Sequence, residues 1–173
     1  VKRKRMKKFI IVLAALPLLG QAEPLQVRVT DVEGRPVGNV VVYLQNHETA
    51  ALPLTHHNHE IEQSDKKFAP YVSVVRQHEE IVFTNHDDIT HHVYSFNAPA
   101  RFDFRLQPGE SNNVMDFAEP GVIAMGCNIH DWMSGYVMVV DTPFYTLTDA
   151  AGLATFADVP ANQYHLVAWH PQM

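Results

Sequence analysis

The chain has very little cysteine: Cys127 is the single one in 173 residues. A lone thiol cannot close a disulfide within the chain. In an oxidising compartment it pairs with another molecule, becomes oxidised or is held as a metal-bound thiolate. Of these three fates, metal binding alone requires other ligands near the cysteine in the fold.

Long hydrophobic runs are also lacking. The apolar run from Phe9 to Leu19 has 11 residues, well short of the roughly 20 that span a bilayer. It follows six Lys/Arg in the first eight residues and precedes the small residues Gly20 and Ala22. This order is typical of a secretory signal peptide over residues 1–22, so we predict a mature start at Glu23 and export to the periplasm. An uncleaved membrane anchor is the alternative.

Positive charge is scarce after the predicted signal peptide. Residues 1–22 hold six of the 13 Lys/Arg and none of the 19 Asp/Glu, so seven bases face 19 acids and the formal charge is −12 with His neutral. Phosphate backbones would repel such a chain, which argues against nucleic acid as a partner. A protein partner with a basic docking face is expected instead.

Helical periodicity is absent outside the N-terminal run. The remaining sequence has turn signals at short intervals, with stretches rich in Val, Ile, Phe, Tyr and Thr between them. Several stretches alternate with period two, as Val27/Val29 and Val137/Val139 do. Many short alternating strands predict an all-β sandwich. The expected strands lie at 25–30, 39–45, 71–75, 80–85, 91–96, 121–127, 135–141 and 164–169.

The cysteine lies in the stretch GCNIHDWMSG, where Cys127, His130 and Met133 have the spacing C-x2-H-x2-M. A strand end followed by a tight loop can bring the three side chains together. Thiolate, imidazole and thioether form a soft set suited to copper, which electron-transfer sites bind with two histidines, one cysteine and a distant methionine. The set is one histidine short. Each residue alone also fits a plain role, as a buried thiol, a capping histidine or a core methionine.

A wider pattern carries a family resemblance. The segment DKKFAPYVSVVRQHEEIVFTNHDDITHHVYS at 65–95, followed by CNIHDWM at 127–133, resembles the small cupredoxins, most closely those of the amicyanin and plastocyanin type. The chain is also similar over residues 24–171 to exported cupredoxin-like proteins named methylamine utilization protein. The resemblance implies a Greek-key β-sandwich with one copper ion that cycles between Cu(I) and Cu(II).

The missing histidine is one of two neighbours. Aligning NHDDITHHV with the cupredoxin pattern places His91 at the ligand position. Strand alternation agrees, because His91 and Val93 then face the interior together while His92 points away. A bulge at the strand end would reverse this facing, so His92 is the alternative.

The resemblance also implies roles around the ligands. His130 would present its ring edge to solvent as the electron exit, and Trp132 beside it would form an apolar docking patch. Asn85 and Asn128 are candidates for hydrogen bonds that orient the ligands. A dehydrogenase donor or a c-type cytochrome acceptor would be the redox partner, in methylamine or other amine oxidation, and the chain would not be an enzyme.

Two flanks lie outside this pattern. The segments 27–44 and 145–169 resemble the opening and closing halves of carboxypeptidase regulatory-like sandwiches. We predict that they pair into a second small β-sandwich layer, with the cupredoxin inserted between them; the alternative is that both extend one sheet of a single sandwich. The predicted division is a signal peptide at 1–22, an N-terminal β-hairpin with a histidine-rich loop at 23–60, the copper domain at 61–141 and C-terminal strands at 142–173.

The histidine-rich loop leaves a question about a second site. Its histidines at 47, 56, 57 and 59 fit a solvated loop better than a metal site, because such tracts are identified by composition alone. They would nevertheless serve a protein that delivers or stores copper, which is the second functional reading. A metal-free interaction module is the third. An oxidase or nitrite reductase is disfavoured, because the single copper motif leaves no second copper site.

Overall fold

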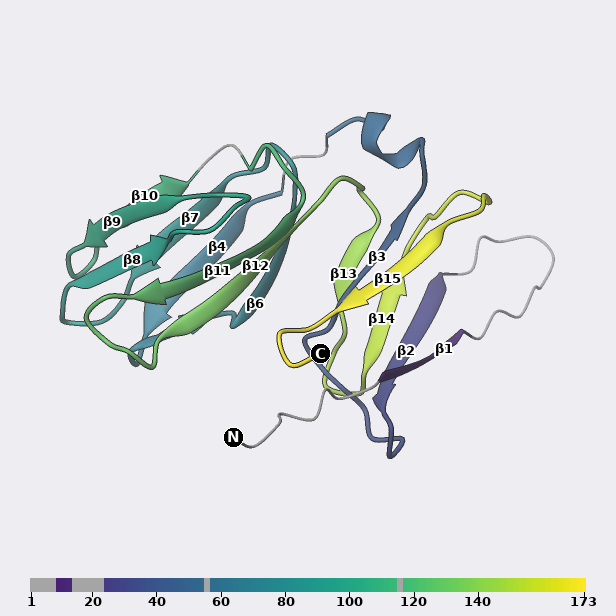
Figure 1. The fold of residues 1–173 in the computed structure, drawn as a ribbon, viewed down its shortest axis with the longest axis horizontal. Helices are drawn as coiled ribbons and strands as arrows, with labels where there is room; N and C mark the ends of the chain where they lie inside the picture. The colour runs from purple at the N-terminus through teal and green to yellow at the C-terminus, as the bar shows by residue number, and fades with distance from the viewer. Residues whose placement is uncertain (1–8, 14–23, 55–56, 115–116) are drawn as a thin grey trace. The chain divides into compact units, whose positions relative to one another are not determined.

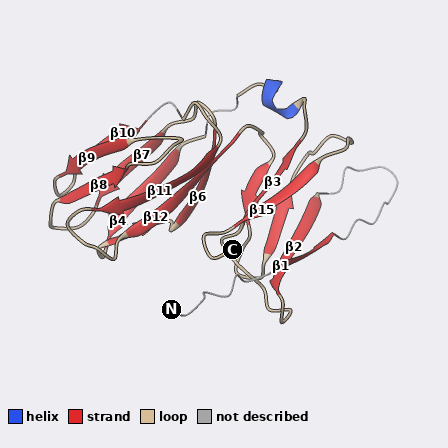
Figure 2. Ribbon diagram, in the orientation of Figure 1, coloured by secondary structure: helices blue, strands red, loops and turns tan. Residues whose placement is uncertain are grey.

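The computed structural model describes residues 9–13, 24–54, 57–114 and 117–173. Nearly all regular structure in these residues is β-strand (Figure 2), and the short 3-10 helix Thr49–Ala51 is the one exception among them. Two compact units form: unit 1 comprises Val1–Ala50 and Phe144–Met173, and unit 2 comprises Ala51–Pro143. No helix within the described ranges has the length and apolar character needed to cross a membrane.

Unit 2 is a sandwich of two sheets (Figure 1). One sheet has the strand order β10 (Ser111–Val114), β7 (Ile81–Asn85), β4 (His59–Ser64) and β5 (Lys67–Ala69). The other has the order β6 (Val72–Arg76), β12 (Ser134–Val140), β11 (Gly121–Cys127), β8 (His91–Ser95) and β9 (Phe102–Leu106). Strand β4 runs parallel to β7 and β6 runs parallel to β12, while the other neighbours are antiparallel.

The core of unit 2 lies between these sheets. Ile61 and Phe83 come from one sheet and Val93, Ile123 and Val137 from the other, and all are essentially inaccessible to solvent. Period-two alternation places these side chains between the sheets, because every second residue of a strand faces the same side. Val137 and Val139 share this core, as predicted, although Met138 and Val140 are also buried.

Unit 1 is a smaller sandwich. One sheet has the order β1 (Phe9–Leu13), β2 (Leu25–Asp31) and β14 (Leu153–Phe156), and the other has β13 (Tyr145–Leu147), β3 (Val41–Gln45) and β15 (His165–Trp169). Its core joins Val27, Val29 and Phe156 of the first sheet to Val42 and Leu44 of the second. The chain is therefore an all-β protein built from sandwiches, as expected from the sequence.

The two flanks pair with each other in unit 1. Strand β3 lies between β13 and β15, with Val41 opposite both Leu147 and Trp169. The buried Thr148 reinforces this pairing, because its hydroxyl accepts from the Val40 amide at 2.9 Å and donates to the Val37 carbonyl at 2.8 Å. Segments about a hundred residues apart in the sequence thus complete one another's sheets.

The N-terminal hairpin expected within 23–60 does not form. Strands β2 and β3 belong to different sheets, because the partners of β2 are β1 and β14. In the tight turn after Asp31, the Asp31 side chain accepts from the amides of Glu33 and Arg35 at 2.9 Å. This turn brings Pro36 back beside Thr30 before the chain reaches β3 in the other sheet.

Two boundaries also differ from the sequence-based division. Unit 2 begins at Ala51 and ends at Pro143, where we predicted 61 and 141. Part of the predicted signal peptide, Phe9–Leu13, pairs with β2 from Leu13 opposite Val27 to Phe9 opposite Asp31. The rest of that peptide lies outside the described residues, and its cleavage stays a prediction.

The histidine-rich segment is not one uniform loop. His47 and His57 are exposed, and His56 lies outside the described residues. His59 instead opens strand β4, half-buried, with its Nε2 atom 2.9 Å from Glu79 Oε2. Glu79 is itself buried, so this histidine has a structural partner.

Candidate metal centre

The candidate ligands come from two neighbouring strands and one loop. His91 is the first residue of β8 and Cys127 the last residue of β11, and the two strands pair with Cys127 opposite Val93. Strand β8 alternates buried and half-buried residues, which turns His91 and Val93 into the core. The pairing of β8 with β11 therefore brings the histidine next to the thiol.

The loop after Cys127 is closed by backbone hydrogen bonds. The Met133 amide donates to the His130 carbonyl at 3.0 Å, and the Cys127 amide donates to the Met133 carbonyl at 3.3 Å. The Asn128 amide donates to the His92 carbonyl at 2.9 Å, which ties the loop to β8. The loop thus turns His130 back toward the thiol, and both His130 and Met133 are buried.

Three ligand atoms converge at this end of the sandwich. Cys127 Sγ lies 3.7 Å from His91 Nδ1 and 3.9 Å from His130 Nδ1. The two imidazole rings have their centroids 5.2 Å apart. One ring nitrogen of His91, the sulfur of Cys127 and one ring nitrogen of His130 all lie within 4.8 Å of one another. Met133 is buried in the same core cluster as Cys127.

These separations fit a shared metal ion. Bonds of about 2.0 Å to nitrogen and about 2.3 Å to sulfur, meeting at about 120°, would hold the two atoms about 3.7 Å apart. The donor set of thiolate, imidazole and thioether favours copper over hard cations, which prefer oxygen. The residues present therefore fit a copper ion.

Asp87 holds the far side of the His91 ring. Its Oδ2 atom lies 2.7 Å from His91 Nε2. A proton on Nε2 donated to this carboxylate leaves Nδ1, the atom that faces Cys127, with a free lone pair. Such a partner fixes both the tautomer and the orientation of a ligand histidine.

Asp87 is itself held in place. Its carboxylate accepts from the backbone amides of Asp65 at 2.8 Å and Lys66 at 3.0 Å. Asn85 supports the same turn, because its side chain donates to the carbonyls of Ile89 at 2.8 Å and Leu106 at 3.0 Å. Asn85 also accepts from the Asp87 amide at 3.0 Å. Asn85 therefore supports the turn that carries Asp87, and its predicted role in orienting the ligands stays a prediction.

The environment lowers the pKa of Asp87. Partial burial opposes ionisation, but the hydrogen bonds from the Lys66 amide, His91 and the Asp65 amide outweigh it. A carboxyl whose pKa is lower in the folded state stabilises the fold at pH values above its unfolded pKa of about 3.9. That stabilisation is lost as the pH falls through the folded value.

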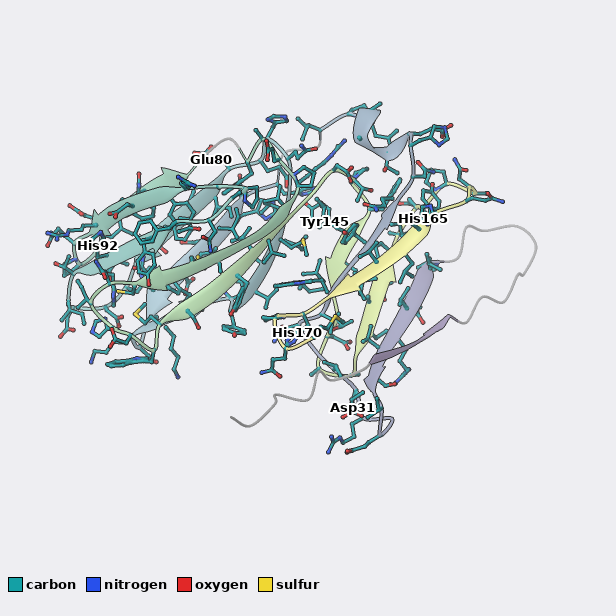
Figure 3. The ribbon with its side chains drawn as sticks, viewed as in Figure 1. Asp31, Glu80, His92, Tyr145, His165 and His170 are labelled. Atoms are coloured by element: carbon teal, nitrogen blue, oxygen red, sulfur yellow. The ribbon has the colours of Figure 1, made fainter. Side chains whose placement is uncertain are left out.

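The neighbouring candidates have other roles. His92, labelled in Figure 3, lies outside the cluster and pairs with Asp103 through its Nε2 atom. The Asn128 side chain is exposed, so this residue contributes through its backbone amide. Trp132 is 67% exposed, and its ring centroid lies 5.2 Å from that of His130, which is 9% exposed.

Asp87 was not among the residues singled out from the sequence. The signal that could have found it is the four-residue spacing of Asp87 and His91, because a ligand histidine needs a partner for its second nitrogen. Ile129, which is 50% exposed and two residues after the cysteine, was also missed.

Comparison with known proteins gives fold likenesses of low identity. No family model matches the chain. No curated protein matches it either.

Among solved structures, a copper-containing nitrite reductase from Thermus scotoductus SA-01 matches with 21% identity and a TM-score of 0.46, over 50% of this chain and 23% of its own. A purple cupredoxin from Nitrosopumilus maritimus matches with 20% identity and a TM-score of 0.42, over 48% of this chain and 100% of its own. An amicyanin variant in its reduced Cu(I) form matches with 16% identity and a TM-score of 0.45, over 57% of this chain and 98% of its own.

Proposed function

We propose that the chain is a mononuclear copper protein that carries single electrons between redox partners. His91, Cys127, His130 and Met133 would hold one copper ion. The observation that carries the proposal is the buried convergence of one thiol and two imidazoles from separate segments. A lone cysteine that only fills space in a core does not require two histidines beside it.

The residues suit electron transfer better than catalysis. When bound, copper would supply a centre that alternates between Cu(I) and Cu(II). His91 is held by Asp87, and backbone hydrogen bonds close the loop of Cys127 and His130, so the ligands need not move between the two states. The cluster is buried, whereas a catalytic metal keeps a position open to substrate.

The surface beside His130 suits a protein partner. Ile129 and Trp132 are exposed next to this histidine, and the Trp132 ring contacts it. The acid excess of the predicted mature chain favours a basic partner face. A dehydrogenase donor or c-type cytochrome acceptor in the periplasm, in methylamine or other amine oxidation, is the partner class that we propose.

A copper titration tests the function. The chain from Glu23 should bind one Cu(II) with an intense visible charge-transfer band that ascorbate bleaches and ferricyanide restores. A colourless complex that surrenders its copper to a chelator within seconds would contradict electron transfer and favour copper delivery.

Asp87→Asn tests the support of the His91 ligand. The amide keeps the size of the side chain but loses the charge and one of the two acceptor oxygens that hold His91 and the Asp65 and Lys66 amides. Loss of such an outer partner typically lowers metal affinity about 10- to 100-fold. Competition with a copper chelator measures this change. The matched control is Asp88→Asn, an exposed neighbour for which we expect unchanged affinity; equal effects of both variants would refute the role of Asp87.

A further inference from the structure

A second cluster of potential ligands lies apart from the copper site. Glu60 and Glu62 alternate with buried residues along β4, so both point to the outer face of their sheet. His86 follows the last residue of β7, the neighbouring strand. One ligand atom from each side chain lies within 4.8 Å of the other two, and all three residues are exposed.

The backbone fixes where these side chains start. The parallel pairing of β4 and β7 places Glu62 opposite Thr84. The His86 amide donates to the Gln63 carbonyl at 2.8 Å, which extends the pairing one residue beyond β7. The Thr84 hydroxyl donates to Glu60 Oε1 at 2.8 Å and orients that carboxylate. The cluster is thus built on two strands rather than on a loose loop.

The charges of the cluster are not balanced by protein. Among the residues that the structure describes, no ion pair reaches Glu60 or Glu62. Two like charges about 4 Å apart repel by about 1 kcal/mol even in water. A bound cation would replace this repulsion with attraction, and the acid excess of the chain raises the local cation concentration.

We propose that Glu60, Glu62 and His86 bind a divalent metal ion of the zinc class. Imidazole nitrogen and carboxylate oxygen are both zinc ligands, and zinc sites with three protein ligands hold water in the fourth position. The cluster has no thiolate or thioether, the ligands that select Cu(I). It therefore differs in metal preference from the copper site and goes beyond the proposed electron transfer.

Zinc titration of the Cys127→Ser chain tests this proposal. The substitution removes the thiolate of the copper site, and the NMR signals distinguish zinc bound at Glu60, Glu62 and His86 from zinc bound at the remaining His91 and His130. Calorimetry should show zinc binding, and amide NMR signals of residues 60–62 and 84–86 should shift as zinc is added. Glu62→Gln and His86→Gln should each weaken this binding about tenfold or more, which corresponds to about 1.4 kcal/mol.

Matched controls remove one exposed acid and one exposed histidine elsewhere. Glu119→Gln and His165→Gln keep the same chemical changes outside the cluster and should leave the affinity unchanged. Equal affinity in all four variants would overturn the proposal. So would zinc-induced shifts confined to the segment around His47 and His57, because they would place the ion in the histidine-rich segment.

Discussion

Replacing Cys127 with serine is expected to abolish the visible charge-transfer band completely. The band requires a thiolate bound to Cu(II), and Cys127 is the single cysteine of the chain. Its Sγ atom lies 3.7 Å from His91 Nδ1 and 3.9 Å from His130 Nδ1. A serine hydroxyl is a hard donor that remains protonated near neutral pH, so it does not replace the thiolate. Absorption and electron paramagnetic resonance spectra of the copper-loaded variant measure the effect.

The fold should survive this substitution, which keeps the comparison clean. Serine is slightly smaller than cysteine, and the Cys127 amide keeps its hydrogen bond to the Met133 carbonyl. Circular dichroism and thermal unfolding of the metal-free proteins provide the check. Survival of the intense band in Cys127→Ser would show that another group binds the copper, and would end the proposal of a cysteine-ligated centre.

The second large effect concerns the adjacent histidines. His91→Gly is expected to lower copper affinity by more than about 100-fold, because loss of a direct ligand should exceed the 10- to 100-fold cost of losing an outer partner. His92→Gly is the matched control, since it places the same glycine in the same strand. His92 lies outside the ligand cluster and pairs with Asp103. Its loss should leave affinity within a few-fold of the wild type.

Imidazole separates ligand loss from damage to the fold. His91 is fully buried, so His91→Gly leaves a cavity beside Cys127 that free imidazole fits. Added imidazole should restore the visible band in His91→Gly and have little effect on His92→Gly. A result with the variants exchanged, in which His92→Gly loses the band, would assign the ligand to His92 through a bulge that the structure does not show.

The alternation of inward and outward side chains along a strand allowed the facing of the candidate ligands to be predicted from the sequence. Period two in β8 correctly turned His91 and Val93 inward and His92 outward. The C-x2-H-x2-M spacing needs only a strand end and a tight loop to converge, and both are local features. Local patterns of this kind can be predicted from the sequence because they depend on few contacts with residues distant in the chain.

The errors came from long-range pairing. A strand such as β2 has the same alternation whether its partner follows at once or lies beyond residue 150, so the sequence does not distinguish a hairpin from the observed pairing with β14. For the same reason His59, placed in a loop, was not expected to meet Glu79. The spacing of Asp87 to His91 is local, but the Asp65 and Lys66 amides that hold Asp87 come from a turn 21 to 22 residues earlier, which the sequence does not reveal.

The pairing of β3 with β13 and β15 has a consequence for the order of folding. Unit 1 is discontinuous, so its sheets cannot be completed until the chain has been made through Trp169, after all of unit 2. Unit 2 is continuous and can form its sandwich first. Closing the contacts of unit 1 across a folded insert also costs less chain entropy than closing them across an open loop. Substitutions that slow the folding of unit 2 should therefore delay unit 1 as well, although they lie outside it.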